Sequence, residues 1–473
     1  MRMMRTMHGI GALAVTLGAC TGDSGGGDAT GATGQVTTAP TSATTSGSGS
    51  SSTGSSSGAG SESESGVASS SGSSSGSSSG GGLKLDVGSP GGGSFDCGCE
   101  LAYVWVANSS EGTVSKINME TLKEEGRYLT RADGMGNPSR TSVALNGDVA
   151  VANRHGGLAK FHADPADCKE SNGMPGIQTS TGKDDVLPWD VEECRAWYID
   201  FPTTNQRPVA FTQGYVTPGT CDSENEKIWT VTSATKSLFP GLGGPGGVIV
   251  SLVDSDTGAI EKQVKIDTFS GDQFGAYGGA VNSNGDLYFT SMAFNGGKLG
   301  WVSIDNFAYK VWTIPPEIGP YGITVDHKDR VWVSSASIGQ VGAGRFDPVA
   351  QTWATVNKGF WSGAGLAEGK DNLMWISSHL GISSVDIDTF ELGPTFMTDE
   401  TVKGVGVDLK GNIWGVTYQG EDDMGNPVGK AMVMKVDHET MALLGTYEGL
   451  DHPYTYSDFT GNALANVTCM PPS

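Results

Sequence analysis

Residues 320–335 read PYGITVDHKDRVWVSS, and this stretch decides the fold. A first apolar strand ends at Asp326, a short polar turn follows, and a second apolar strand carries Trp332 near its start. Apolar residues alternate with a period of two on both sides of the turn, which is typical of antiparallel strands joined by a hairpin. The stretch therefore predicts the first two strands of a β-sheet unit.

The second of these strands recurs along the chain as an apolar run, often around an aromatic residue, that ends in Ser, Thr or Asn. It is found at 104–108, 149–153, 228–232, 287–291, 331–335, 374–378 and 413–417. The last four copies lie roughly 40 to 45 residues apart, which is the period of a β-propeller with about four strands per blade. We therefore expect an all-β fold, a seven-bladed β-propeller that spans 95–473.

The first blade has no inner strand of its own ahead of 104–108. Residues 453–459 read PYTYSDF, resemble the inner strand at 320–326, and follow the seventh blade. We expect this C-terminal strand to complete the first blade and so close the ring, because closure removes a free sheet edge. A Cys-containing insertion at about 166–206 follows the second strand pair.

The N-terminus predicts export. Arg2 and Arg5 precede a short apolar stretch at 9–19, which is too short to span a bilayer and is typical of a signal peptide. Residues 17–20 read LGAC and resemble the bacterial lipobox, which implies cleavage before Cys20 and lipidation of its thiol. The alternative is an ordinary secretory signal at 1–19. The expected location is the bacterial cell envelope, as a membrane-anchored lipoprotein.

Residues 20–94 are dominated by Gly, Ser, Thr and Ala. Such a segment buries too little apolar surface to offset its ordering entropy, so we expect a flexible tether. An O-glycosylated stalk has the same composition and stays open. The formal net charge of −23 argues against a nucleic-acid partner and against a basic membrane patch, which leaves the lipid anchor as the expected membrane contact.

Apart from Cys20, the six cysteines of an exported chain are expected to form disulfides. They are Cys97, Cys99, Cys168, Cys194, Cys221 and Cys469. Closure of the ring would bring Cys469 near Cys97 and Cys99, so we expect one bridge there. A metal or redox role for the Cys97–Cys99 pair is the alternative.

The stretch 320–347, with its PYGITVD strand and the later GRFD at 344–347, resembles the repeat of virginiamycin B lyase (streptogramin lyase) propellers and, more loosely, NHL repeats. The resemblance implies a lyase that uses a divalent metal such as Mg²⁺, held by His and Glu after second strands. His155 and His379 occupy such positions, but the matching loops supply no acid. Two histidines need a third ligand, so we assign no metal ligand and expect no tightly bound cofactor.

Alignment of the inner strands on Tyr321 predicts a ring of side chains around the mouth of the central channel. It contains Ser139, Arg207, Tyr277, Tyr321, Ser362, Lys403 and Tyr454. Tyrosine with Arg or Lys can bind an anionic or sugar-like ligand; packing between blades is the alternative. We expect a surface-tethered binding or interaction module for a protein, glycan or small molecule. A metal-dependent lyase or lactone hydrolase and a purely structural envelope protein remain alternatives.

Overall fold

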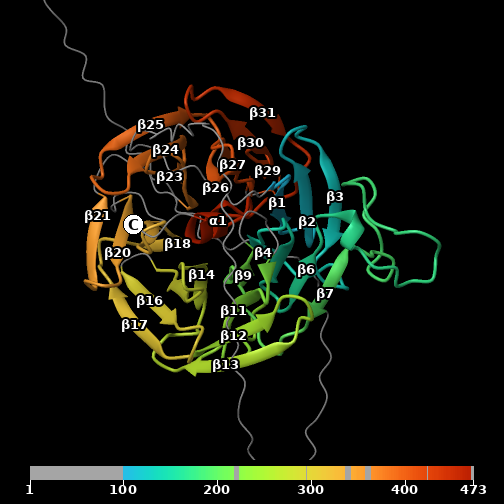
Figure 1. The fold of residues 1–473 in the computed structure, drawn as a ribbon, viewed down its shortest axis with the longest axis horizontal. Coiled ribbons are helices and arrows are strands. Elements are labelled where there is room, and N and C mark those ends of the chain that lie inside the picture. The colour runs from blue at the N-terminus through green and yellow to red at the C-terminus, as the bar shows by residue number, and fades with distance from the viewer. Residues whose placement is uncertain are drawn as a thin grey trace, which may run out of the picture. The chain divides into compact units, whose positions relative to one another are not determined.

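Seven β-sheets surround a common axis as the blades of a propeller (Figure 1). The structure, a computed structural model, describes residues 100–217, 223–293, 296–335, 342–356, 364–422, 424 and 426–469. The expected signal peptide and tether, together with Cys20, Cys97, Cys99, Cys221 and Ser362, lie outside these residues. Within them, no helix is long and apolar enough to cross a membrane.

Six blades have four antiparallel strands, and the first has the three strands β1-β2-β3. The inner strands are β4 (Pro138–Val143), β8 (Val209–Phe211), β14 (Ala276–Val281), β18 (Pro320–Val325), β22 (Leu366–Glu368) and β26 (Val402–Val407). The second strands are β1 (Tyr103–Asn108), β5 (Val149–Asn153), β11 (Lys227–Ser233), β15 (Leu287–Ser291), β19 (Val331–Ser335), β23 (Leu373–Ser378) and β27 (Ile413–Thr417). All seven predicted second strands are therefore confirmed.

The outer half of each blade consists of a third and a fourth strand. The third strands are β2 (Thr113–Asn118), β6 (Leu158–Phe161), β12 (Val248–Asp254), β16 (Gly297–Val302), β20 (Ala343–Asp347), β24 (Gly381–Asp386) and β30 (Val433–Val436). The fourth strands are β3 (Glu124–Leu129), β7 (Arg195–Ile199), β13 (Ile260–Ile266), β17 (Tyr309–Ile314), β21 (Thr352–Val356), β25 (Leu392–Met397) and β31 (Leu443–Tyr447). Small additions are the hairpins β9 (Tyr215–Val216) with β10 (Ser223–Glu224) and β28 (Gly420–Glu421) with β29 (Pro427–Val428), and the 3-10 turn η1 (Pro165–Asp167).

In the fifth and seventh blades, a hydrogen bond between a tryptophan and an aspartate links the second strand to the end of the inner strand. Trp332 Nε1 donates to Asp326 Oδ2 at 2.8 Å, and Trp414 Nε1 donates to Asp408 Oδ2 at 3.0 Å. Each aspartate directly follows an inner strand, and each tryptophan is fully buried in the next strand. The bond fixes the hairpin and satisfies an indole N–H that burial would otherwise leave without a partner.

The C-terminal segment closes the ring beside β1, as the sequence predicts. Pro453 forms a β-bridge with Asn108, Tyr454 N donates to Ala107 O at 3.0 Å, and Trp105 N donates to Phe459 O at 2.9 Å. Thr455 Oγ1 accepts from Ala107 N, so a side chain replaces one bond of the regular ladder. The closing segment is therefore paired with β1 but less regular than the six inner strands.

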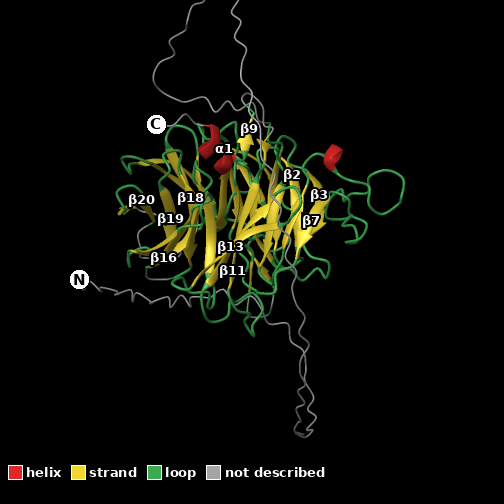
Figure 2. Ribbon diagram, turned by 60° about the horizontal axis from the view of Figure 1, so that its bottom comes forward, coloured by secondary structure: helices red, strands yellow, loops and turns green. Residues whose placement is uncertain are grey.

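A helix, α1 (Asn462–Cys469), follows the closing segment and lies over one end of the central channel (Figures 1 and 2). Asn462 Nδ2 donates to the carbonyl of Glu368 at 2.9 Å, and the Glu368 carboxylate pairs with His327 Nδ1 at 2.5 Å. Leu464 is buried against the inner strands. The sequence pattern does not predict this helix, which blocks one mouth of the channel.

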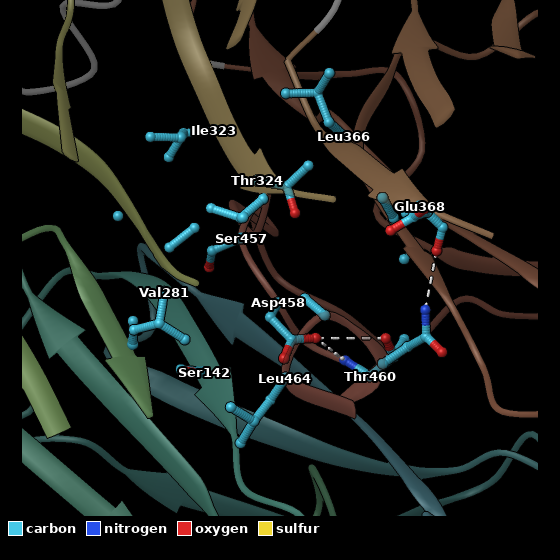
Figure 3. A pocket seen from close by; sticks show the side chains of 18 of the residues that line it. Ser142, Val281, Ile323, Thr324, Leu366, Glu368, Ser457, Asp458, Thr460 and Leu464 are labelled. Carbon is cyan, nitrogen blue, oxygen red and sulfur yellow. Dashed lines mark hydrogen bonds between the residues drawn. The ribbon is translucent and has the colours of Figure 1, made fainter. Parts of the chain in front are cut away.

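Between α1 and the inner strands lies a cavity of about 40 Å³, lined on its sides by Ser142, Val281, Thr324 and Glu368 (Figure 3). This volume admits little more than a few waters. Asp458 is turned towards the start of α1, where it accepts from Gly461 N at 2.8 Å; burial raises the pKa of Asp458 to about 6. This end of the channel is therefore filled and its acid is engaged with the helix.

The segment between β6 and β7 carries the Cys168–Cys194 disulfide, which confirms that these two cysteines are bridged. β7, the outer strand of the second blade, falls inside the range of 166–206 expected for the insertion. Cys469 is also disulfide-bonded. Its expected partners Cys97 and Cys99 lie outside the described residues, so that pairing stays a prediction.

Candidate ligand-binding site

The mouth opposite α1 is built from the first residues of the inner strands, where the strand register is broken. In β14, β18 and β26 the pairing skips Tyr277, Tyr321 and Lys403, respectively. β4 shows the same break at Ser139. A β-bulge interrupts the alternation of a strand and redirects the side chain at that position. The aligned positions are therefore the places where side chains leave the blade pattern.

Four tyrosines form one buried cluster at this mouth: Tyr277, Tyr321, Tyr454 and Tyr456. The ring centroids of Tyr277 and Tyr321 are 5.0 Å apart, and those of Tyr321 and Tyr456 are 4.8 Å apart. The hydroxyl of Tyr454 is hydrogen-bonded to the hydroxyls of Tyr277 (3.0 Å) and Tyr321. We call these residues the tyrosine cluster; two of them come from inner strands and two from the closing segment.

Four cations surround the tyrosine cluster, and we call them the mouth cations. Arg140 Cζ lies 3.3 Å from the ring centroid of Tyr456, and Arg154 Cζ lies 4.3 Å from that of Tyr454. Arg207 Cζ lies 5.0 Å from the ring centroid of Tyr277, and Lys403 Nζ lies 5.0 Å from that of Tyr321. Such contacts are attractive, at about 0.5 to 2 kcal/mol each. None of the four forms a salt bridge with a described residue. The mouth is thus strongly positive in a chain whose net charge is negative.

The pKa values around Tyr277 record this positive field. Burial raises the pKa of Tyr277, but the charges of Arg207 and Arg140 and bonds from neighbouring hydroxyls outweigh it and lower the pKa to about 8. Desolvation, together with the charge of Arg154, lowers the pKa of Arg207. The surroundings therefore favour a negative charge at this place over a further positive one.

Five buried donors at the mouth have no hydrogen-bond partner in the described part of the chain, namely Ser139 Oγ, Arg140 Nη2, Arg154 Nε, Asn205 Nδ2 and Tyr456 Oη. Four of them belong to residues that are almost fully buried: Ser139, Arg140, Asn205 and Tyr456. Arg140, Tyr456 and Asn205 are only 1%, 2% and 1% exposed, so water at the surface does not satisfy them. Asn205 Oδ1 meanwhile accepts from Arg207 Nε at 2.6 Å, which leaves its amide group free to donate. Unsatisfied buried donors are rare and costly, which makes this group notable.

A hollow of about 290 Å³ lies next to the tyrosine cluster. Phe274 and Met292 line it and also pack against the cluster, and Arg207 Cζ lies 5.6 Å from the Phe274 centroid. Gly275 forms part of the wall, where an added Cβ would lie 2.5 Å from Asn205 Nδ2. Lys298 and Asp272 give the rim one charge of each sign. The hollow has about the volume of a small-molecule site.

The structure brings together the five ligand-binding candidates of the sequence analysis, Arg207, Tyr277, Tyr321, Lys403 and Tyr454. They also pack and bond to one another across blades, so the packing alternative describes part of their role. Sequence reasoning missed Arg140, Arg154, Asn205 and Tyr456. Tyr456 lies two residues after Tyr454 in an extended segment, and this period of two was a usable signal. Arg140 directly follows the aligned Ser139 and was hidden by the bulge.

The two histidines of the lyase hypothesis have other neighbours. His155 Nδ1 lies 2.7 Å from Met135 O. His379 is at the surface, 3.5 Å from Thr401 Oγ1, and desolvation and the charge of Lys403 lower its pKa. Among the described residues, neither histidine belongs to a group of three side chains that could hold a metal ion. These residues do not fit the divalent metal that the resemblance implies.

One such group of three exists in the described ranges: Asp148, His162 and Asp167. It lies away from the mouth, at the other end of the second blade. Lys160 Nζ is 3.1 Å from Asp148 Oδ2, and Ala163 N donates to Asp148 Oδ1 at 2.9 Å. A protein cation thus already neutralises the buried carboxylate, and we assign no metal there.

Fold and site together define a seven-bladed β-propeller with one mouth blocked by a helix and a cationic, tyrosine-lined site at the other. No protein-family model and no curated protein sequence matches the chain. Solved structures similar to it include virginiamycin B lyase from Staphylococcus aureus (14% identity, TM-score 0.41, covering 66% of this chain and 83% of that one).

Two further similar structures are apo AztD from Citrobacter koseri and Kuenenia stuttgartiensis hydrazine synthase. The first is 9% identical with a TM-score of 0.44, covering 75% of this chain and 96% of that one. The second is 10% identical with a TM-score of 0.47, covering 77% and 100%. Likenesses this distant carry no argument about function, which must come from the site itself.

Proposed function

We propose that this protein is a binding module whose ligand site is the tyrosine-lined mouth of the propeller. The observation that supports this most is the gathering of four cations around four tyrosines, beside a hollow, with no acidic partner for any of the four cations among the described residues. The buried donors without partners at the same place support the proposal further. Since α1 fills the opposite mouth, a ligand would enter from the side of the tyrosine cluster.

The proposal includes the setting of the module. The signal at 1–19, the lipobox-like sequence ending at Cys20 and the Gly/Ser-rich segment at 20–94 support an exported propeller tethered to a bacterial membrane through a lipid. Radiolabelled palmitate should be incorporated into the wild-type protein and not into Cys20→Ala. Labelling of both proteins, or of neither, would contradict the anchor.

To test binding at the mouth, the whole mature protein is applied to an array of glycans and small metabolites, and its retention on each compound is measured. Arg207→Met/Lys403→Met removes two mouth cations. The matched control is Arg195→Met/Lys262→Met. Arg195 lies over the ring of Trp189 and Lys262 over the ring of Phe307, and both cations belong to outer strands, β7 and β13. We expect at least one compound class to be retained by wild type and control and lost from the mouth variant. Equal retention by all three proteins, or by none, would contradict the proposal.

A further inference from the structure

The buried arginines of the mouth are electrostatically incomplete. Arg140 is 1% exposed and Arg207 is 4% exposed, and neither is ion-paired with a described residue. Removing a charge from water is costly unless a partner compensates it. Contacts with tyrosine rings are attractive but bring no opposite charge. A negative group from outside the chain would complete the site.

Among the described residues, the acid of the closing segment and the acid at the rim of the hollow do not supply that group. Asp458 belongs to the same closing segment as Tyr454 and Tyr456, but its carboxylate accepts from Gly461 N, directly before α1. It also faces Thr460 (Figure 3). Asp272 lies on the exposed rim of the hollow, and its Oδ1 accepts from Gln273 N at 2.9 Å. Both carboxylates therefore serve local backbone groups.

The donors that lack partners match the needs of an oxyanion. Arg140 Nη2 offers a charged N–H, Tyr456 Oη a hydroxyl, and Asn205 Nδ2 an amide N–H. Carboxylate and phosphate oxygens accept from all three kinds of donor, and bonds that involve a charged partner are about twice as strong as neutral ones. A cation would meet only repulsion from the mouth cations, and a neutral sugar would leave their charge uncompensated.

From these contacts we infer that the mouth binds the oxyanion group, carboxylate or phosphate, of a small ligand whose body occupies the hollow beside Phe274. This inference rests on the proposed function and narrows it to a chemical class. The lowered pKa of Tyr277 supports it, because the same positive field that favours a phenolate would favour a bound oxyanion.

The test compares galacturonate with galactose, which differ by a carboxylate in place of a hydroxymethyl group, and uses inorganic phosphate as the smallest oxyanion. Binding to the whole mature protein is measured by calorimetry at pH 7 and up to about 10 mM ligand. We expect saturable binding of galacturonate or phosphate, at least about tenfold tighter than that of galactose, and weaker at high salt. If both oxyanions bind, they should compete.

Two variants locate the site. Arg140→Met should weaken oxyanion binding at least about tenfold, and Tyr456→Phe, which keeps the ring, should weaken it several-fold. Arg195→Met on the outer strand β7 should leave it unchanged. Equal affinity for galactose and galacturonate would overturn the inference and leave the binding function standing. Binding of neither oxyanion would overturn the inference, and the array experiment would then decide the function separately.

Discussion

The guanidinium carbon of Arg140 lies 3.3 Å from the centroid of the Tyr456 ring. Arg140 comes from the inner strand of the second blade and Tyr456 from the segment that closes the first. The contact joins parts of the chain that are far apart in sequence. Closure of the ring and assembly of the mouth are therefore one structural event, because the closing segment supplies half of the tyrosine cluster.

Removal of the charge should affect stability very differently at two buried arginines, Arg127 and Arg140. Arg127 forms ion pairs with Glu124 at 2.8 Å and with Glu111 at 3.0 Å. Arg127→Met leaves these two carboxylates without a cation and should lower the free energy of unfolding by about 3 to 5 kcal/mol. Arg140→Met removes a charge without an acidic partner and should change it by less than about 1 kcal/mol in ligand-free buffer. Urea denaturation measures both. A loss at Arg140 as large as that at Arg127 would show that the protein itself compensates Arg140.

Oxyanion binding should weaken as pH rises past the pKa of Tyr277. The pKa lowered to about 8 means that Tyr277 is neutral below pH 8 and a phenolate above it. The phenolate would compete with the ligand for the charges of Arg207 and Arg140, so affinity should fall by up to about tenfold per pH unit above 8. Tyr277→Phe should remove this dependence.

The same residue can be observed without ligand. Absorbance near 295 nm should show a tyrosine that ionises about two pH units before the others in wild type and is missing in Tyr277→Phe. Tyr128→Phe is the control, because burial raises the pKa of Tyr128 instead. An unchanged low-pH phase in Tyr277→Phe would contradict the assignment.

The helix that blocks the channel should depend on its asparagines. Asn462 Nδ2 and Asn466 Nδ2 donate to Glu368 O at 2.9 and 3.2 Å. Asn462→Ala removes the shorter bond from a buried carbonyl and should cost about 1 to 3 kcal/mol in urea denaturation. Asn284→Ala, in a turn at the surface, is the control. An unfolding midpoint of Asn462→Ala equal to that of wild type would mean that α1 is held by other contacts.

The cysteine at the end of α1 should be bridged to the N-terminal pair. Peptide mapping without reduction is expected to recover Cys469 with Cys97 or Cys99, and Cys168 with Cys194. A bridge across the whole propeller would add on the order of 5 kcal/mol in the chain-entropy model. Recovery of Cys469 as a free thiol, or with Cys221, would contradict the pairing.

The periodic parts of this molecule could be predicted from sequence because each blade repeats the same local pattern. The Trp332 strand and its six counterparts, and the closing role of 453–459, follow from period and from one missing strand. Helix α1 could not be predicted in the same way: it occurs once, and its burial depends on the width of the channel.

The candidate site was predicted in part for a similar reason. Tyr277, Tyr321 and Lys403 occupy equivalent bulges, so an alignment of inner strands finds them. Arg140 lies in the inner strand β4, one residue beyond the equivalent bulge, and the alignment on Tyr321 did not single it out. Asn205 lies in the irregular segment that leads to β8 and is outside the repeat. The buried donors without partners, which suggest an oxyanion ligand, could therefore not be predicted from the sequence.

The most direct test of the account is a crystal structure of the wild-type protein soaked with selenate, with anomalous diffraction measured at the selenium edge. Selenate is a tetrahedral oxyanion that can be located without interpretation of its surroundings. The account predicts a peak within hydrogen-bond distance of Arg140 Nη2 and Tyr456 Oη, absent from Arg140→Met. A map with selenate bound elsewhere on the surface and none at the mouth would contradict it.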